Sequence, residues 1–197
     1  MNARGQQGRK PRADVQRNRA ALLEAAQRHF LRDGVGTSLE AVAKEAGVGP
    51  GTLYRHFPTR EVLLAAVLQS RTAELAVRRE DIADIADAGM ALTQWLRAME
   101  DYLSAYSGLP EPLMSAARAH DPDNPLTVPC DELIATTDAY ARTAQRTGYV
   151  RPSVTGHDLF LAACSVAWIK GTGATEEAVD RLRALIAHGY RESDDRT

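Results

Sequence analysis

The feature that most constrains this chain is a pair of short amphipathic segments joined by the tight sequence Ala46-Gly47-Val48. Residues 39–46 place apolar side chains on one face at helical spacing, and residues 50–57 do so again. Gly47 suits a sharp turn because glycine adopts positive φ without a steric penalty. The small alanines before the turn allow a second helix to cross closely. This pattern predicts a helix-turn-helix.

Residues at the ends of these segments predict where the helices begin and end. Thr37 and Glu40 have the spacing of a capping box, with Thr37 as the N-cap. Pro50 suits the first turn of the next helix, and a second proline follows that helix. An earlier helix is expected to start at a cap by Asp14 and to end at the glycine-containing residues 33–36.

The net charge of −2 hides a strong asymmetry between the two parts of the chain. Residues 1–60 have a balance of +6, and residues 61–197 have a balance of −8. A basic module on an acidic body predicts a polyanionic partner for the first part, since basic side chains release counterions from phosphates. The extreme N-terminus carries a single acid, Asp14, among six basic residues: Arg4, Arg9, Lys10, Arg12, Arg17 and Arg19.

The stretch from Thr37 to Leu63 resembles the DNA-binding domain of the TetR family of transcription regulators. The family pattern is a capped helix, the residues AGV, a small residue, and then GTLYxHF followed by a basic residue and leucine. This sequence has AGV at residues 46–48 and GTLYRHF at residues 51–57. It departs from the pattern at Gly49, where the family usually has a serine or threonine cap, so one hydroxyl that contacts phosphate is missing.

The resemblance covers residues 15–63 and implies roles for individual side chains on double-stranded DNA. Phosphate contacts are implied for Thr37, Tyr54, His56 and Arg60. Base reading or close approach to the groove is implied for Pro50, Gly51, Thr52 and Arg55.

The remainder of the chain is also expected to be helical, so the predicted fold class is all-α. Helices are expected at residues 60–78, 81–105, 112–119, 127–147, 154–172 and 175–190. The expected domains are a flexible basic arm (1–13), a three-helix DNA-binding domain (14–60), a helical ligand-binding and dimerisation domain (61–192) and a tail (193–197).

The resemblance implies that the helical body senses a small apolar or amphipathic ligand. Aromatic and flexible side chains line cavities of this kind, although plain core packing is the favoured interpretation for each residue taken alone. The candidate ligand-binding residues are Trp95, Met99, Tyr102, Met114 and Trp168.

The resemblance also implies a homodimer in which the last two helices pair with their copies. A single short recognition helix reads few base pairs, and two half-sites add affinity and specificity. The candidate interface residues are Phe160, Cys164, Leu182, Leu185 and Tyr190, for which core packing is the alternative.

Several other classes of protein receive no support from the sequence. The two cysteines lie far apart and are expected to be free thiols, and no spacing indicates a metal site, a cofactor or an enzyme's active site. No apolar run reaches the roughly 18–20 residues that span a bilayer, so a cytoplasmic protein is expected. The leading hypothesis is a repressor released from a palindromic operator by a ligand. The alternative is a DNA-binding regulator or architectural protein without a ligand.

Overall fold

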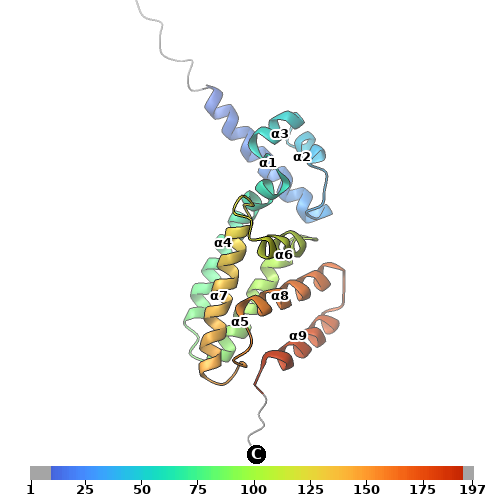
Figure 1. The fold of residues 1–197 in the computed structure, drawn as a ribbon. Helices are drawn as coiled ribbons and strands as arrows, with labels where there is room; N and C mark the ends of the chain where they lie inside the picture. Colours follow the sequence, from blue (N-terminus) through green and yellow to red (C-terminus); the bar gives the residue numbers. More distant parts are fainter. Residues whose placement is uncertain (1–9, 193–197) are drawn as a thin grey trace, which may run out of the picture. The chain divides into compact units, whose positions relative to one another are not determined.

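The computed structural model describes residues 10–192, which form nine α-helices joined by turns and short connections (Figure 1). The expected all-α class is confirmed, since the one pairing of extended residues within this range is an isolated bridge between Val150 and Arg191. The chain divides into two compact units, of which the first ends at Val67 and the second begins at Leu68. The helices are α1 (Lys10–Asp33), α2 (Leu39–Glu45), α3 (Pro50–His56), α4 (Arg60–Ala83), α5 (Ala88–Leu103), α6 (Pro110–Ala119), α7 (Thr127–Arg146), α8 (Gly156–Gly171) and α9 (Glu176–Tyr190).

The first unit packs α1, α2, α3 and the start of α4 around a small apolar core. α2 contacts both α1 and α3. The guanidinium of Arg19 covers the edge of this core, with its carbon 5.4 Å from the centroid of the Phe57 ring. Side chains with no exposed surface in this unit include Leu22, Ala25, Ala26, Phe30, Val42, Ala43, Leu53 and Leu63. Helical spacing therefore placed Leu22, Ala26 and Phe30 correctly on the buried face of α1, whereas Val15 and Leu31, which were assigned to the same face, are 52% and 65% exposed.

The start of α1 corrects the expected cap at Asp14. The helix begins at Lys10, so Asp14 has a helical neighbour on each side. An aspartate caps a helix only where its own backbone is still extended, because its side chain must fold back onto the next amide groups. The Asp14 carboxylate instead pairs with Arg17 one turn further along the same helix. The expected arm at residues 1–13 lies largely outside the described residues.

The start of α2 corrects the expected cap at Thr37. Ser38 is the N-cap, with an extended backbone and a side-chain oxygen that accepts a hydrogen bond from the Ala41 amide at 3.3 Å. Thr37 stands one residue too early for such a bond. Glu40 consequently occupies the second helical position, and its carboxylate accepts a hydrogen bond from the Ser38 hydroxyl at 2.8 Å. The capping group is shifted by one residue from the predicted register.

The helix expected at residues 81–105 is divided differently in the structure. α4 continues to Ala83, and a new helix starts only after the N-cap Asp87, whose carboxylate accepts a hydrogen bond from the Met90 amide at 2.7 Å. Ile82 therefore belongs to α4, where it is buried. The boundary was missed because apolar residues continue at helical spacing through the break, and only the cap geometry marks the new start.

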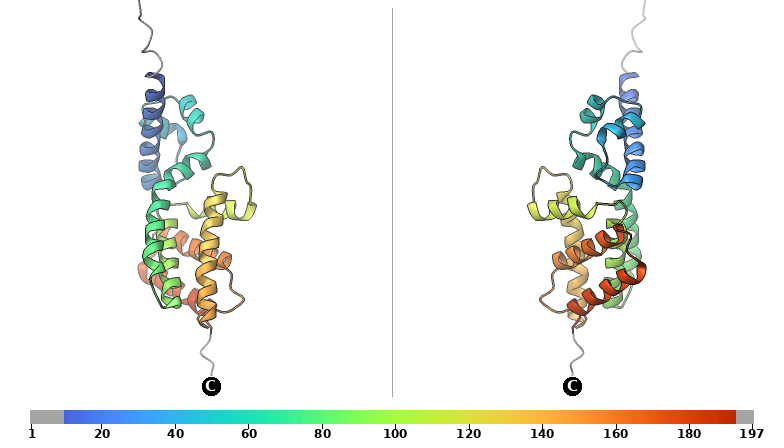
Figure 2. Two further views of the ribbon diagram at one scale, coloured as in Figure 1. Left: turned by 90° about the vertical axis from the view of Figure 1, so that its left-hand side faces the viewer. Right: turned by 90° about the vertical axis from the view of Figure 1, so that its right-hand side faces the viewer.

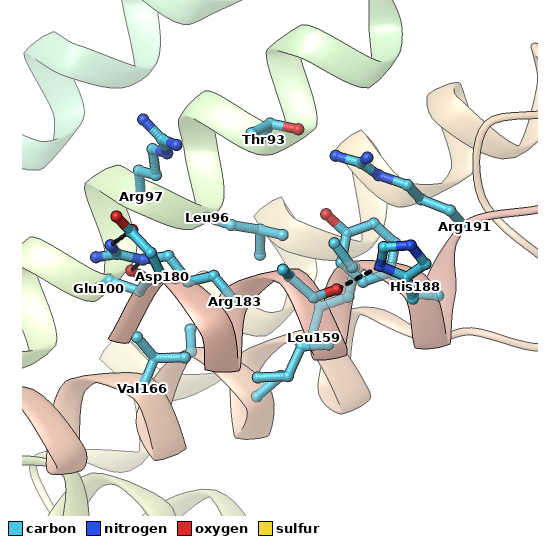
Figure 3. Close-up of a pocket in the computed structure, with 16 residues that line it drawn as sticks. Thr93, Leu96, Arg97, Glu100, Leu159, Val166, Asp180, Arg183, His188 and Arg191 are labelled. Atoms are coloured by element: carbon cyan, nitrogen blue, oxygen red, sulfur yellow. Dashed lines mark hydrogen bonds and ion pairs between the residues drawn. The ribbon is translucent and has the colours of Figure 1, made fainter. Parts of the chain in front are cut away.

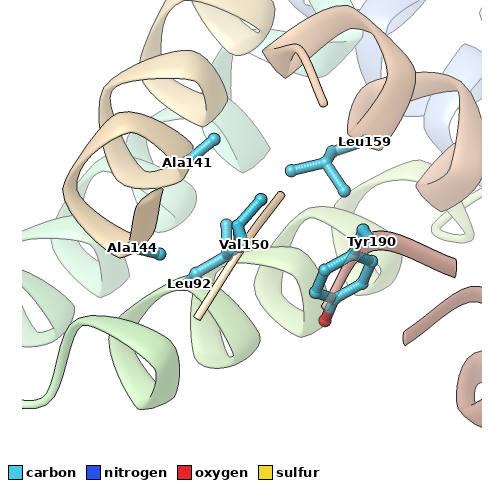
Figure 4. Packing of buried hydrophobic residues seen from close by; sticks show 6 residues of the cluster. All are labelled: Leu92, Ala141, Ala144, Val150, Leu159 and Tyr190. Atoms are coloured by element: carbon cyan, nitrogen blue, oxygen red, sulfur yellow. The ribbon is translucent and has the colours of Figure 1, made fainter. Parts of the chain in front are cut away.

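The second unit is organised around α8, which packs against α5, α6, α7 and α9. α8 is apolar on most of its surface, as expected for a helix covered on several sides. Figure 2 shows α9 lying beside α8 in both views. A cluster of six buried residues joins α5, α7, α8 and α9 to the connection before α8 (Figure 4). Its members are Leu92, Ala141, Ala144, Val150, Leu159 and Tyr190.

The end of α9 is attached to the connection between α7 and α8 by backbone and side-chain hydrogen bonds. The Arg151 amide donates to the Tyr190 carbonyl at 3.0 Å, and the Glu192 amide donates to the Tyr149 carbonyl at 3.1 Å. The Arg151 guanidinium donates to the carbonyls of His188 and Arg191 at 2.9 and 3.0 Å. These bonds satisfy carbonyl groups that the end of a helix leaves without intrahelical partners.

Two further expectations from the sequence concern cysteine chemistry and membranes. Cys130 and Cys164 are free and buried, and burial raises the pKa of each thiol to about 12. Across residues 10–192, none of the helices combines the length and the apolar character needed to cross a bilayer.

Candidate DNA interface and ligand cavity

The turn between α2 and α3 has the geometry that the sequence predicted. Gly47 adopts a φ of +70°, where a side chain would be strained. The Val48 amide donates to the Ala43 carbonyl at 3.0 Å, which closes the turn. Ala43 and Leu53 are fully buried, so the inner faces of the two helices are fixed and the outer face of α3 remains exposed.

The outer face of α3 brings most of the predicted DNA-contacting residues together. Pro50, Gly51, Tyr54 and Arg55 are exposed on this short helix. The Arg55 guanidinium donates to the Gly51 carbonyl at 3.0 Å and to the Thr52 hydroxyl at 3.2 Å. Gly49 is the N-cap and provides no side-chain hydrogen bond, as its lack of a hydroxyl dictates. This face therefore places hydrogen-bonding side chains beside a stretch of backbone, at Gly51, that carries no side chain of its own. Such a surface can approach the edges of base pairs closely.

Tyr54 is connected to α2 through a carboxylate that the sequence did not single out. Its hydroxyl donates to the Glu40 carboxylate at 3.2 Å. Hydrogen bonds from the backbone amide of Glu40 itself, and then from Ser38 and Tyr54, hold the pKa of this carboxyl below its usual range. The same hydrogen bond to Glu40 raises the pKa of Tyr54. The predicted phosphate contact Tyr54 thus has a negative charge as its neighbour.

Replacing Glu40 with glutamine should strengthen binding to DNA by roughly three- to tenfold, because it removes a charge that repels phosphate and keeps a hydrogen-bond acceptor for Tyr54. Fluorescence anisotropy on a labelled duplex at fixed salt measures this change. Glu24→Gln, which removes an equal charge from the exposed side of α1, is the matched control. An equal gain in both variants would show that net charge alone is responsible.

Thr37 and Arg60 lie together beside the start of α2, although neither is on α3. The Arg60 guanidinium donates to the carbonyls of Val35 and Thr37 at 2.6 and 2.8 Å. Arg60 therefore ties the connection between α1 and α2 to the first turn of α4. The Thr37 hydroxyl lies 3.3 Å from Nδ1 of His29. A phosphate contact by either residue would be made from an internal hydrogen-bonded network that already fixes its position.

His29 is buried at the junction of α1 and α2 and was not among the residues predicted from the sequence to matter for the DNA-binding part. Its Nδ1 lies 3.3 Å from the Asp33 carboxylate, and its Nε2 lies 2.9 Å from the Glu45 carboxylate. Arg28 also pairs with Glu45, at 2.6 Å. The only signal in the sequence was the spacing of His29 and Asp33, one helical turn apart. These contacts to Glu45 join the last turns of α1 to the end of α2.

The second unit contains two cavities of about 710 and 470 Å³ between α4, α5 and α7. They share the lining residues Arg79, Ala135 and Thr136 and therefore adjoin one another. Both volumes fall within the range of small-molecule sites. Trp95 and Tyr102, two of the predicted ligand-binding residues, line the smaller cavity. Tyr140, which the sequence analysis did not single out, lines the larger one.

Aromatic rings and fixed hydroxyl groups give these cavities their chemistry. The rings of Trp95 and Tyr140 are stacked, with centroids 5.6 Å apart. The indole nitrogen of Trp95 donates to the Thr137 hydroxyl at 2.9 Å, and that hydroxyl donates to the Leu133 carbonyl at 2.7 Å. Burial raises the pKa of Tyr102, so its hydroxyl stays neutral at physiological pH. Arg79, Glu80 and Glu132 add charged groups to the otherwise largely apolar lining, which suits an apolar molecule with few polar groups.

The other predicted ligand-binding residues lie elsewhere. Met99 has no exposed surface and belongs to the core. Met114 is half-buried on α6 and lines neither of these cavities. Trp168 is 55% exposed on α8 and lines a small surface hollow of about 140 Å³. These residue types share an apolar character, and the sequence does not tell which of them face a cavity.

The predicted interface residues also fall into two groups. Phe160, Cys164 and Tyr190 are buried within the single chain, so a second copy packed on its surface would not reach them. Leu182 is half-buried, and Leu185 is 71% exposed on α9. Helical spacing distinguishes the two sides of α8 poorly because ten of its 16 residues are apolar and they lie all around the helix. The apolar side chains that α8 does expose are Leu161 and Trp168.

Comparison with known families tests the resemblance over two separate parts of the chain. Residues 22–67 match the family model described as bacterial regulatory proteins, tetR family. Residues 87–192, more than half of the chain, match the model described as the C-terminal domain of SbtR-like transcriptional regulators. The chain belongs to the TetR family. As a TetR-family protein it is a DNA-binding transcriptional regulator and not an enzyme.

Individual relatives agree with this assignment. The HTH-type transcriptional regulator UidR of Escherichia coli K12 is 38% identical over 74 residues, which cover 36% of this chain and 38% of UidR. The curated relatives are matched over less than half of their own length, between 38% and 43%. The crystal structure of the TetR regulator SCO0520 from Streptomyces coelicolor is 31% identical, with a TM-score of 0.55 over 89% of this chain and 99% of that one.

A more distant solved structure shares the fold alone. The ketosteroid regulator KstR2 of Mycobacterium tuberculosis is 19% identical, with a TM-score of 0.60 over 89% of this chain and 95% of that one. The TetR fold thus accommodates very different sequences around the same order of helices. The DNA sequence and ligand that each member recognises therefore depend on the residues of its own sites.

Proposed function

We propose that this TetR-family regulator is a repressor that binds a palindromic operator as a homodimer and is released by a small apolar or amphipathic molecule. The observation that carries the proposal is the presence, in one chain, of an exposed recognition face on α3 and of aromatic-lined cavities in the helical body. A regulator that responds to a molecule needs both of these features.

The proposed DNA contacts are those implied by the family motif, on polar side chains that are exposed (Tyr54 and Arg55) or half-buried (Thr37, Thr52, His56 and Arg60). Tyr54 and His56 are assigned to phosphates, and Arg55 with Thr52 to the edges of bases. Pro50 and Gly51 allow close approach of the helix N-terminus. Thr37 and Arg60 are assigned to phosphates beside the start of α2. Each phosphate contact releases counterions, so binding should weaken as salt rises.

The proposed dimer interface uses the exposed apolar side chains of α8 and α9. Leu161 and Trp168 on α8 and Leu185 on α9 supply apolar surface that a second copy would remove from water. Two copies present two recognition helices, which must reach half-sites roughly 34–36 Å apart on one face of the duplex. A palindromic operator follows from the two-fold symmetry of such a dimer.

The proposed ligand site comprises the two adjoining cavities between α4, α5 and α7. Their apolar walls, the stacked Trp95 and Tyr140 rings and the neutral hydroxyl of Tyr102 favour an uncharged or weakly polar molecule. A ligand releases the repressor only if it binds one conformation better than the DNA-binding one. One solved structure with this fold is named a gamma-butyrolactone receptor, which is an analogy at the level of fold.

The test is binding of the purified chain to the intergenic DNA upstream of its own gene, measured by fluorescence anisotropy at two salt concentrations. Wild-type protein should prefer this duplex to a random one, and Tyr54→Ala should weaken specific binding at least tenfold through loss of a phosphate contact on each recognition helix. Tyr54→Phe keeps the ring and removes only the hydroxyl, so it should show an intermediate loss.

Equal, weak binding of both duplexes would contradict a sequence-specific repressor at this site and favour an architectural role. If specific binding is found, the same assay becomes a screen for releasing molecules. A variant that fills the larger cavity, Ala139→Phe, should then abolish release without weakening DNA binding, since Ala139 lines that cavity and is exposed on α7.

A further inference from the structure

A separate cavity of about 350 Å³ lies between α5, α8 and α9 in the second unit (Figure 3). It shares none of its lining residues with the two cavities between α4, α5 and α7. Its volume lies at the lower end of the range for small-molecule sites. The cavity therefore has room for a ligand distinct from the one proposed above.

The walls of this cavity are apolar in the middle. Leu159, Ala163 and Val166 on α8 form one wall, and all three are almost completely buried. Leu96 on α5 and Ile186 on α9 complete the apolar part. A hydrocarbon chain placed here would exchange water for these side chains, which is favourable in proportion to the apolar area covered.

One end of the cavity is charged but internally neutralised. The Arg183 guanidinium donates to the Glu100 carboxylate at 2.7 Å and to the Asp180 carboxylate at 2.8 Å. Glu100 is only 5% exposed, and burial raises the pKa of its carboxyl although Arg183 opposes the shift. The two carboxylates that line the cavity, those of Glu100 and Asp180, therefore both form ion pairs with Arg183. Arg97 stands at this same end on α5 (Figure 3).

The opposite end of the cavity is lined by Arg191 and His188, without a lining carboxylate, and carries the positive charge of Arg191 (Figure 3). The Arg191 guanidinium lies 5.0 Å from the centroid of the Tyr149 ring, which holds it in place without neutralising it. Nδ1 of His188 donates a hydrogen bond to the Ala184 carbonyl at 2.8 Å, so Nε2 is an acceptor in the neutral ring. Within residues 10–192, no carboxylate forms an ion pair with Arg191.

The end of a helix normally disfavours an anion because its free carbonyl groups carry partial negative charge. At the end of α9 this effect is reduced. The guanidinium of Arg151 donates hydrogen bonds to the carbonyls of His188 and Arg191 and adds a positive charge beside them. These hydrogen bonds therefore reduce the repulsion that the C-terminus of α9 would exert on an anion.

We propose that this cavity binds an amphipathic carboxylate, with its acid group at Arg191 and its hydrocarbon chain along Leu159 and Leu96. A guanidinium matches the two oxygens of a carboxylate through parallel hydrogen bonds. The apolar middle of the cavity excludes ligands that are charged along their length. The proposal concerns a second site and does not depend on which molecule occupies the cavities beside α4.

Isothermal titration calorimetry of the full chain with decanoate tests the proposal. One decanoate should bind per chain, and decanol, which has the same chain without the charge, should bind at least tenfold more weakly. Arg191→Gln should weaken decanoate binding about tenfold, which corresponds to about 1.4 kcal/mol at 25 °C. Arg97→Gln removes the same charge from the other end of the same cavity and should change the affinity less than threefold.

Two further variants locate the binding site. Ala184→Phe fills the cavity from an exposed position on α9 and should abolish binding, whereas Ala139→Phe fills the larger cavity beside α4 and should leave it unchanged. Abolition by Ala139→Phe alone would place decanoate in the other cavity and overturn the proposal. Equal affinity for decanoate and decanol, equal losses in the two arginine variants, or no binding at all would overturn it as well. None of these outcomes depends on binding to DNA.

Discussion

Replacing Gly156 with alanine should lower the free energy of unfolding by about 3 kcal/mol, because the added methyl group has no space. A Cβ at this first residue of α8 would stand 2.5 Å from the amide nitrogen of Asp138 and 2.6 Å from its Cα. These are backbone atoms of α7, so no side-chain rotation relieves the overlap. The two helices would have to separate, which would also break the hydrogen bond from the Gly156 amide to the Asp138 carboxylate at 3.0 Å.

Thermal unfolding followed by circular dichroism measures this effect, and a loss of 3 kcal/mol corresponds to a decrease in Tm of roughly 6–12 °C. Gly171→Ala at the other end of α8 is the matched control, since a Cβ there would meet nothing within 4 Å. This control should be neutral or should stabilise the chain by up to about 1 kcal/mol. Equal destabilisation by the two substitutions would mean that the backbone conformation of glycine is required at both positions. The close contact between Gly156 and α7 would then not be the cause.

Replacing Leu185 with glutamate should convert the proposed dimer into monomers. Leu185 is 71% exposed in the single chain, so the substitution leaves the fold of one copy intact. In a dimer formed through α8 and α9, the same carboxylate would be buried without a partner, at a cost of several kcal/mol. Because two linked recognition helices bind far more tightly than one, operator affinity should decrease at least roughly a hundredfold.

Light scattering coupled to size-exclusion chromatography gives the mass of the particle, and anisotropy gives the affinity for the operator. Val128→Glu is the matched control, because Val128 is 63% exposed on α7 and places the same charge outside the proposed interface. It should remain dimeric with unchanged affinity. If the Leu185→Glu variant remained dimeric and the Val128→Glu variant became monomeric, the interface would be formed by α7 and not by α9.

The DNA-binding part could be predicted almost completely because its constraints are local. The positive φ of Gly47, the buried faces of α2 and α3 and the end of α3 all follow from neighbouring residues. The errors there were shifts in register, such as Ser38 in place of Thr37 as a cap. Choosing between adjacent hydroxyl residues requires the backbone angles, which the sequence does not contain.

The body of the chain was predicted less well because its sites depend on contacts between distant segments. The helices were identified correctly apart from the break at residues 84–87, where apolar spacing continues across the boundary. Trp95 and Tyr102, two of the candidate ligand-binding residues, line the smaller cavity, while Tyr140, which lines the larger one, was missed because nothing near it in the sequence sets it apart. The pairing of Arg183 with Glu100 joins residues on α9 and α5 and has no local signal.

The sequence by itself determined the all-α class, the helix-turn-helix and the residues offered on its outer face, because helical periodicity, capping and glycine turns act over a few residues. The tertiary structure alone decided which apolar residues are core, surface or cavity wall. Phe160 and Leu161 are neighbours of similar character, yet one is fully buried and the other is 36% exposed. That difference depends on which helices pack against α8, and packing is a property of the whole chain.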